Sequence, residues 1–149
     1  MKLTTKGRYG VKAMIDLALQ GSEEPVSLKS IAERQNLSEN YLEQLFAVLK
    51  KSGLVKSVRG AQGGYLLAGN PADITIGSIL RSLEGSLAPV DCVLEEDPVK
   101  CDKSDSCITK FVWEKIRDSV NSVVDSITLA DLIAEYKKKN DAKDCTSNT

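Results

Sequence analysis

Apolar residues recur with a helical period between positions 38 and 52, and this is the clearest pattern in the chain. Their spacing of i, i+3, i+4 and i+7 predicts a helix with one buried side, formed by Leu42, Leu45, Phe46 and Leu49. Ser38 is placed to cap the first turn, because a serine hydroxyl there can accept a free backbone N–H. The opposite face is polar. By itself it fits a solvated helix as well as a helix that is presented to DNA.

Two more helical patterns precede this segment. Thr4 or Thr5 is placed to cap an opening helix that ends near Gly21. Its apolar residues Val11, Met14, Ile15 and Ala18 lie on one face. Residues 28–35 form a shorter pattern that Ser27 is placed to cap. Only Asn36 and Leu37 separate this pattern from Ser38. Two helices joined by so short a turn, the second with a polar outer face, predict a helix-turn-helix unit.

Two short runs of strand-forming residues follow, at positions 54–58 and 65–67. The glycine-rich loop 59–64 between them lacks the Gly-Lys-Ser/Thr sequence and the following helix of a nucleotide-binding loop. We therefore expect a β-hairpin that forms the wing of a winged helix-turn-helix domain, with Arg59 at its tip. An arginine flanked by glycines can enter a narrow minor groove, although a solvated hairpin arginine would give the same sequence.

The second half of the chain combines helices with one long loop. A short helix is predicted over residues 75–84, and residues 86–106 follow as a loop, a length that is usually functional or disordered. The helical pattern then resumes for about five turns, with an apolar stripe formed by Ile108, Val112, Ile116, Val120, Val123 and Ile127. So long a stripe predicts a dimerisation helix, with packing inside one subunit as the alternative.

A capping-box-like sequence, Thr128-Leu-Ala-Asp131, predicts the start of a last helix. We expect residues 141–149 to be a disordered polar tail. The predicted fold class is mainly α with a small β-hairpin wing. The predicted organisation is a winged helix-turn-helix domain (1–85), a cysteine-containing sensor loop (86–107), dimerisation helices (108–140) and the tail.

The charge is distributed unevenly along the 149 residues, whose net charge is −1. Up to Asn70 there are ten Lys and Arg against six Asp and Glu, whereas the remainder has ten against fifteen. A mildly basic half therefore precedes an acidic one, which fits a polyanion-binding module. No apolar run approaches the about 20 residues of a membrane span, and no signal peptide is evident, so we expect a cytoplasmic protein without membrane association.

The chain has no histidine, which excludes Ser-His-Asp and Cys-His catalysis and every histidine-containing metal site. Three of its four cysteines, Cys92, Cys101 and Cys107, lie in the acidic loop with the spacing C-x8-C-x5-C. This spacing leaves an iron–sulfur cluster, zinc and unligated thiols open. A thiol-disulfide enzyme is disfavoured because there is no CxxC motif, and we expect no enzymatic activity.

Four blocks of sequence resemble the Rrf-two family of bacterial winged-helix repressors: MKLTTKGRYGVKAMIDLAL, the helix containing NYLEQLF, KSGLVKSVRGAQGGYLL, and the cysteine loop closed by CITKFVW. The resemblance runs from Met1 to about Ile133 and is greatest to the IscR-type iron–sulfur regulators. It implies a homodimer that binds a roughly palindromic double-stranded DNA operator, with a long helix crossing to the partner.

The resemblance also implies a sensor. In IscR-type members three loop cysteines and a histidine bind a 2Fe–2S cluster that changes promoter choice, and the cysteines match Cys92, Cys101 and Cys107. Cysteine-metabolism repressors of the same family lack the cluster and respond through a cysteine-synthase partner. Nitric-oxide-sensing relatives use an aspartate of the partner subunit near the N-terminus, where this chain has Arg8.

This chain departs from the IscR-type pattern at the fourth ligand. The histidine position, three residues after the last loop cysteine, is Lys110. The gap between Cys92 and Cys101 is also longer than is usual in the family. The candidates for a fourth ligand are Cys145, a carboxylate of the loop, a residue of the partner subunit and an exogenous thiol.

Glu43 and Arg59 match DNA-contacting positions of the IscR-type proteins. A glutamate can accept a hydrogen bond from cytosine N4 in the major groove, and a wing arginine suits the minor groove. Asn40 stands where the relatives have a serine, which puts the sequence preference in question, and Tyr41 fits either a DNA contact or the core. The candidate DNA-binding residues are Ser38, Asn40, Tyr41, Glu43, Gln44, Arg59 and Gly60.

Overall fold

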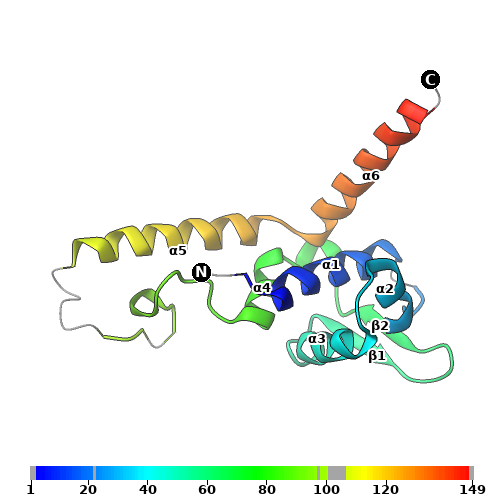
Figure 1. Cartoon of the computed structure of the whole chain (residues 1–149), viewed down its shortest axis with the longest axis horizontal. Helices are drawn as coiled ribbons and strands as arrows, with labels where there is room; N and C mark the ends of the chain where they lie inside the picture. Colours follow the sequence, from blue (N-terminus) through cyan, green and yellow to red (C-terminus); the bar gives the residue numbers. More distant parts are fainter. Residues whose placement is uncertain (1–2, 22, 97, 101–106, 148–149) are drawn as a thin grey trace.

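The computed structural model describes residues 3–21, 23–96, 98–100 and 107–147 (Figure 1). In chain order its elements, with η marking a 3-10 helix, are α1 (Thr5–Leu19), α2 (Leu28–Gln35), α3 (Glu39–Lys51), β1 (Val55–Val58), β2 (Gly64–Leu67), η1 (Pro71–Asp73), α4 (Ile76–Glu84), η2 (Asp91–Val93), α5 (Ile108–Ser126) and α6 (Leu129–Ser147). The predicted fold class, mainly helical with one β-hairpin, is confirmed. No helix within the described ranges is long and apolar enough to cross a bilayer.

The winged-helix body is built around the buried side of α3. The four apolar residues predicted for that side, Leu42, Leu45, Phe46 and Leu49, are all buried. They share one core with Met14 and Leu17 of α1, Ile31 of α2 and Ile79 of α4. Full burial of each such side chain stabilises the fold by about 1.5–3 kcal/mol, so this core fixes the position of α3 against three other helices.

The predicted hairpin is present directly after α3. β1 and β2 pair antiparallel, with Val58 opposite Gly64 at the end next to the turn. The backbones of Val26 and Tyr65 exchange two hydrogen bonds of 2.8 and 2.9 Å, and the ring of Tyr65 lies 4.9 Å from that of Phe46. The hairpin is therefore attached both to the segment before α2 and to α3.

Helices α5 and α6 extend away from this body. In Figure 1, α5 runs along the side opposite to α3, and α6 projects outward from the junction between them. Backbone hydrogen bonds from Ile76 to Ile127 (2.8 Å) and from Leu129 to Ile74 (2.9 Å) join this junction to the start of α4. None of the residues of α5 is buried, but its second half contacts the body, because Val120 and Val124 pack against the core and Arg81 on α4 donates to Asn121 and Asp125.

The predicted capping box at the start of α6 is confirmed. The Asp131 carboxylate accepts the N–H of Thr128 at 3.0 Å, and the Thr128 hydroxyl accepts the N–H of Asp131 at 3.2 Å. The expected disorder of residues 141–149 is wrong over much of its length, because α6 continues to Ser147. No glycine or proline follows Pro98, so nothing in the local sequence ends the helix earlier.

Two smaller expectations also need correction. The loop 86–106 is not without structure, since η2 forms within it and buries Val93. Thr4 occupies the N-cap position of α1, but its hydroxyl makes no cap to that helix. It donates to Glu84 at the end of α4 instead.

Candidate nucleic-acid interface and cysteine loop

The outer face of α3 is polar and exposed from its first turn to its last. Asn40, Glu43 and Gln44 are exposed, while Lys50 and Lys51 occupy the last turn. Ser38 caps the helix as predicted, and its hydroxyl accepts the N–H of Tyr41 at 3.3 Å. The face therefore offers amides and a carboxylate near the N-terminus and cations near the C-terminus.

The turn before α3 is set by Asn36, which ends α2. Asn36 adopts a left-handed conformation with φ of 53°, and the N–H of Leu37 donates to Ala32 at 3.0 Å. Asparagine tolerates this conformation better than most residues. The short connection predicted between the two helices therefore has a defined geometry, and Ser27 caps α2 at its other end through Ser30 at 3.2 Å.

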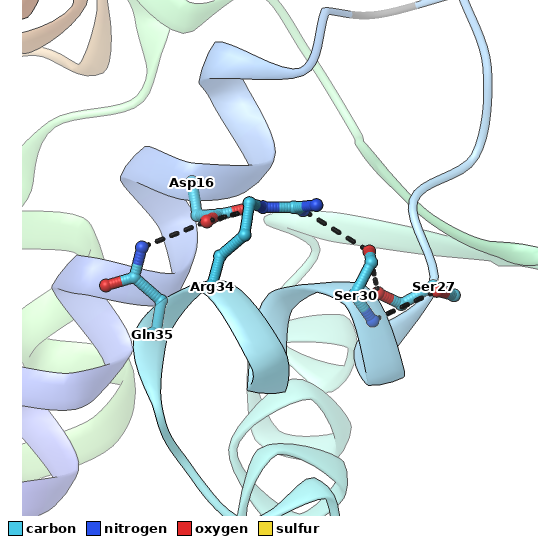
Figure 2. Close-up of polar contacts among 5 residues, drawn as sticks. All are labelled: Asp16, Ser27, Ser30, Arg34 and Gln35. Carbon is cyan, nitrogen blue, oxygen red and sulfur yellow. Dashed lines mark hydrogen bonds and ion pairs between the residues drawn. The ribbon is translucent and has the colours of Figure 1, made fainter.

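A buried carboxylate on α1 holds the C-terminal end of α2 (Figure 2). Asp16 is only 3% exposed and accepts from Arg34 through Nη2 at 2.7 Å and through Nε at 3.0 and 3.1 Å. Gln35 donates to the same carboxylate at 2.9 Å, and Arg34 also donates to Ser30 at 3.3 Å. The hydrogen bond with Asp16 raises the pKa of Arg34. This cluster fixes α2, and hence the helix-turn-helix unit, against α1.

Tyr41 has the packing role that was one of the two alternatives left open by its sequence position. Its side chain is half-buried, and its hydroxyl donates to Thr5 at 3.3 Å. The rings of Tyr41 and Tyr9 meet edge to face with centroids 6.1 Å apart. Tyr41 therefore packs the first turn of α3 against the first turns of α1 and still borders the polar face.

Arg59 and Gly60 are both exposed at the turn of the hairpin. Gly60 has φ of +119°, a conformation that favours glycine, and a Cβ on Gly63 would lie 2.2 Å from the carbonyl oxygen of Val58. The turn therefore depends on its glycines, which leaves Arg59 as its long cationic side chain. In Figure 1, α3 and the hairpin lie on the same side of the body, opposite to α5.

The structure describes two of the three loop cysteines. Cys92 is half-buried in η2, and Cys107 is exposed immediately before α5. Cys101 lies outside the described residues, as does the side chain of Cys145, although the backbone of Cys145 belongs to α6. Among the described residues no three Cys, Asp or Glu side chains converge on a metal site.

The contacts of Cys107 favour its thiolate form. Its Sγ lies 3.0 Å from the hydroxyl of Thr109. That hydrogen bond, followed by the backbone N–H of Lys110, lowers the pKa of the thiol. The described part of the loop is also anchored, because Arg117 on α5 donates to the carbonyl oxygen of Val93 at 3.0 Å.

Sequence reasoning missed the residues that position α2 and the loop. Asp16 gave one usable signal, an acidic residue within a strongly apolar stretch of the first helix, which required a buried partner. Nothing local identified Arg34 as that partner, since it lies 18 residues away. Glu84 and Glu95 gave no signal, because Gly7 and Asn121, which donate to them, lie on other helices.

The comparisons with known proteins agree with this architecture. Residues 3–135 match the Rrf2 family, described as iron-dependent transcriptional regulators. The HTH-type transcriptional regulator CymR of Bacillus subtilis is 52% identical over 132 residues, which cover 89% of each chain.

Two solved structures are also similar. The structure of CymR, the global cysteine regulator of B. subtilis, has a TM-score of 0.75 and 50% identity and covers 91% of this chain and 98% of its own. The structure of IscR from T. potens has a TM-score of 0.76 and 56% identity and covers 93% of this chain and 90% of its own. With these relatives and a helix-turn-helix followed by a wing, the chain belongs to the Rrf2 family and is a DNA-binding transcriptional regulator.

Proposed function

We propose that α3 reads base edges in the major groove of double-stranded DNA while the hairpin places Arg59 in the adjacent minor groove. The observation that carries this proposal is the exposed polar face of α3, which shares one side of the body with the hairpin turn. The buried side of α3 is fixed by the core, so this face is presented in a defined orientation. Such a helix is rigid enough to align short side chains with base edges.

The side chains on this face have different expected roles. Glu43 can accept from cytosine N4, and the amides of Asn40 and Gln44 suit adenine. Ser38 and Tyr41 border the face, and Gly60 lies at the hairpin turn. These three residues are expected to contact the backbone of DNA, which positions the protein without reading sequence. A carboxylate is otherwise unfavourable close to phosphates, so base reading gives Glu43 a physical reason to be at this position.

The active unit is proposed to be a homodimer. Apolar residues on α5 are exposed in the single chain, with Ile108 at 85%, Phe111 at 62% and Val123 at 58%. A second copy would cover this face with a self-complementary surface, as expected for a two-fold dimer. Two copies of α3 would then meet two half-sites of a roughly palindromic operator.

The loop between α4 and α5 is proposed to be the sensor, holding a 2Fe–2S cluster through Cys92, Cys101 and Cys107. Three thiolates fit the preference of iron–sulfur clusters, and the lowered pKa of Cys107 favours its ligating form. A bound cluster would supply redox chemistry, and its occupancy would depend on cluster assembly. In this chain the fourth ligand is not histidine.

Lys110 is a specific reason to consider a second way in which DNA binding is controlled, without an iron–sulfur cluster. It occupies the position at which the cluster-binding relatives have histidine, and CymR, a cysteine regulator, is as similar to this chain as IscR is. In the alternative, the loop holds no cluster and a cysteine synthase binds the regulator. A nitric-oxide or redox signal at the same loop is a further form of this control.

The DNA proposal can be tested with duplexes selected by the wild-type protein from a random pool. Arg59→Ala should weaken binding to the selected duplex by about 1–3 kcal/mol, because a wing contact is lost. Lys137→Ala on α6 is the matched control, since Lys137 is also an exposed cation but lies away from the proposed interface. Equal affinities of the Arg59→Ala variant and the wild type at moderate salt would remove the wing from the interface.

The sensor proposal can be tested by purifying the protein without oxygen and recording its visible absorption spectrum. We expect a coloured protein with iron and acid-labile sulfide, and loss of both after Cys92→Ala. Colourless protein after attempted reconstitution would contradict the cluster. Retention of a cysteine synthase by that colourless protein would then support the alternative.

A further inference from the structure

Glu84, the last residue of α4, caps the first turn of α1 from outside that helix. Its Oε1 atom accepts the N–H of Thr4 at 3.2 Å and the N–H of Gly7 at 2.8 Å, and it also accepts the hydroxyl of Thr4. The N–H groups of a first helical turn have no partner inside their own helix, and a carboxylate there suits the positive end of the helix dipole. The start of α1 is therefore tied to a residue that lies 77 positions beyond Gly7 in the chain.

Two glycines let α4 approach α1 this closely. A Cβ on Gly7 would lie 2.8 Å from Oε1 of Glu84, and a Cβ on Gly10 would lie 2.0 Å from Cδ1 of Leu83. The last turn of α4 is thus in direct contact with the first turns of α1. A shift of this end of α4 would change the hydrogen bonds that Thr4 and Gly7 donate to Glu84.

The same turns of α1 contact the start of α3. The hydroxyl of Tyr41 donates to Thr5 at 3.3 Å, and its ring packs edge to face on Tyr9. Tyr41 also donates its N–H to the capping hydroxyl of Ser38. The first turn of α1 therefore borders the turn of α3 that carries the candidate base-reading residue Asn40.

The end of α4 is connected on its other side to the cysteine loop. Ser86, two residues after Glu84, donates to Glu95 at 2.6 Å, and Asn121 on α5 donates to the other oxygen of Glu95 at 2.8 Å. Arg81 on α4 donates to Asn121 at 2.8 Å. Glu95 follows η2, which carries Cys92, so the position of this part of the loop is linked to the end of α4.

We propose that Glu84 is a positioning residue that couples the cysteine loop to the first turn of α3. A ligand or partner that displaces residues 91–95 would disturb the contacts of Glu95 and shift the end of α4. Glu84 would carry that shift to α1, and Tyr41 would carry it to α3. This inference rests on the proposed reading of DNA by α3, but it does not depend on which signal the loop senses.

A double-mutant cycle tests the coupling. Binding to the selected duplex is measured for the wild type, Glu95→Ala, Glu84→Ala and the double variant, all as full-length dimers. We expect Glu95→Ala to change affinity about three-fold or more in the wild-type background and to have little effect in the Glu84→Ala background, because coupled residues are not additive. Glu84→Gln keeps an acceptor oxygen, so Glu95→Ala should have an intermediate effect in that background. This intermediate effect tests the coupling if Glu84→Ala does not fold.

Asp131→Ala is the matched control, because Asp131 also caps a helix N-terminus but lies outside this chain of contacts. Glu95→Ala should have the same effect with or without Asp131→Ala. Equal effects of Glu95→Ala in the wild-type and Glu84→Ala backgrounds, or no effect at all, would overturn the inference.

Ser82 on α4 offers another route, since its hydroxyl lies 2.6 Å from that of Ser52 at the end of α3. Coupling that is lost in Ser82→Ala but kept in Glu84→Ala would also overturn the inference. If Glu43→Ala and Arg59→Ala leave binding unchanged, the proposed reading of DNA is wrong. If Glu43→Ala and Arg59→Ala change DNA binding as expected but the effects of Glu95→Ala and Glu84→Ala are additive, the reading of DNA stands and only the role of Glu84 is contradicted.

Discussion

At the scale of single residues, a few buried or shared carboxylates hold the regulator together. Asp16 is the clearest case, because it is almost completely buried and satisfied by donors from α2. Burial of an unpaired carboxylate is costly, so its partners stabilise the fold mainly by preventing that cost. Arg34 itself is partly exposed, so water screens the ion pair and limits its further contribution to stability.

Arg34→Ala should lower the free energy of unfolding by about 1–3 kcal/mol, because the buried Asp16 carboxylate would lose its hydrogen bonds from Arg34. Gln35 would remain as its donor from α2. Urea unfolding monitored by circular dichroism measures this change. Lys29→Ala, which removes an exposed cation from the same helix, should stay within about 0.5 kcal/mol of the wild type. Similar values for the two variants would contradict a stabilising role of the Asp16 cluster.

The hydrogen bonds of Glu95 predict that the stability of the fold depends on pH. Hydrogen bonds from Ser86 and then Asn121 lower its pKa. A carboxyl group with a lowered pKa in the folded state contributes stability that is present above its unfolded pKa of about 4.3 and is lost as the pH falls through the folded pKa.

We therefore expect wild-type stability to fall more steeply than that of Glu95→Gln as the pH drops below about 4.3. Thermal unfolding at a series of pH values measures the two slopes. Parallel curves would show that these hydrogen bonds do not favour the ionised form.

At the scale of elements, the hairpin depends on close backbone contact with the segment before α2. A Cβ on Gly64 would lie 2.3 Å from the carbonyl oxygen of Val26, whereas a Cβ on Gly69 would meet nothing within 4 Å. The bridge between Val26 and Tyr65 would have to open to admit a larger residue. The hairpin turn and Arg59 would then move relative to α3.

Gly64→Ala should lower the free energy of unfolding by about 1–3 kcal/mol, the usual cost of forcing extra atoms into a packed site. Gly69→Ala, which adds the same methyl group to open space, should be close to neutral. The two variants can be compared by urea unfolding. Equal stability would mean that the hairpin is not held by this contact.

Most elements could be predicted because their determinants are local. The apolar side of α3 follows from spacings of three and four residues, and the caps at Ser27, Ser38 and Thr128 act over three residues. Contacts between distant segments could not be predicted this way. The bond from Gly7 to Glu84 joins residues 77 positions apart, and no local pattern specifies such a pair.

At the scale of the whole molecule, the described chain is a DNA-binding winged-helix body beside a helix, α5, that exposes apolar side chains. Exposed apolar surface of this kind marks an interaction site in proteins of ordinary composition. The same helix carries Arg117 and Asn121, which hold the cysteine loop. Dimer formation and sensing are therefore expected to use opposite faces of one element.

Val123→Glu should shift the protein from dimer to monomer, because a charge would be buried within the proposed α5 interface. Sedimentation velocity measures the shift. Ser122→Glu adds the same charge at a neighbouring exposed position and should leave the dimer largely intact. A monomeric wild type, or a dimeric Val123→Glu variant, would contradict the proposed interface.

The most direct test of the account is the base preference of the wild type and Glu43→Ala, determined by sequencing the duplexes that each selects from one random pool. We expect the wild type to select a two-fold symmetric site. Glu43→Ala should lose discrimination at one position in each half-site, with a smaller loss of overall affinity. A uniform loss of affinity across all sequences, or an unchanged preference, would contradict base reading by α3.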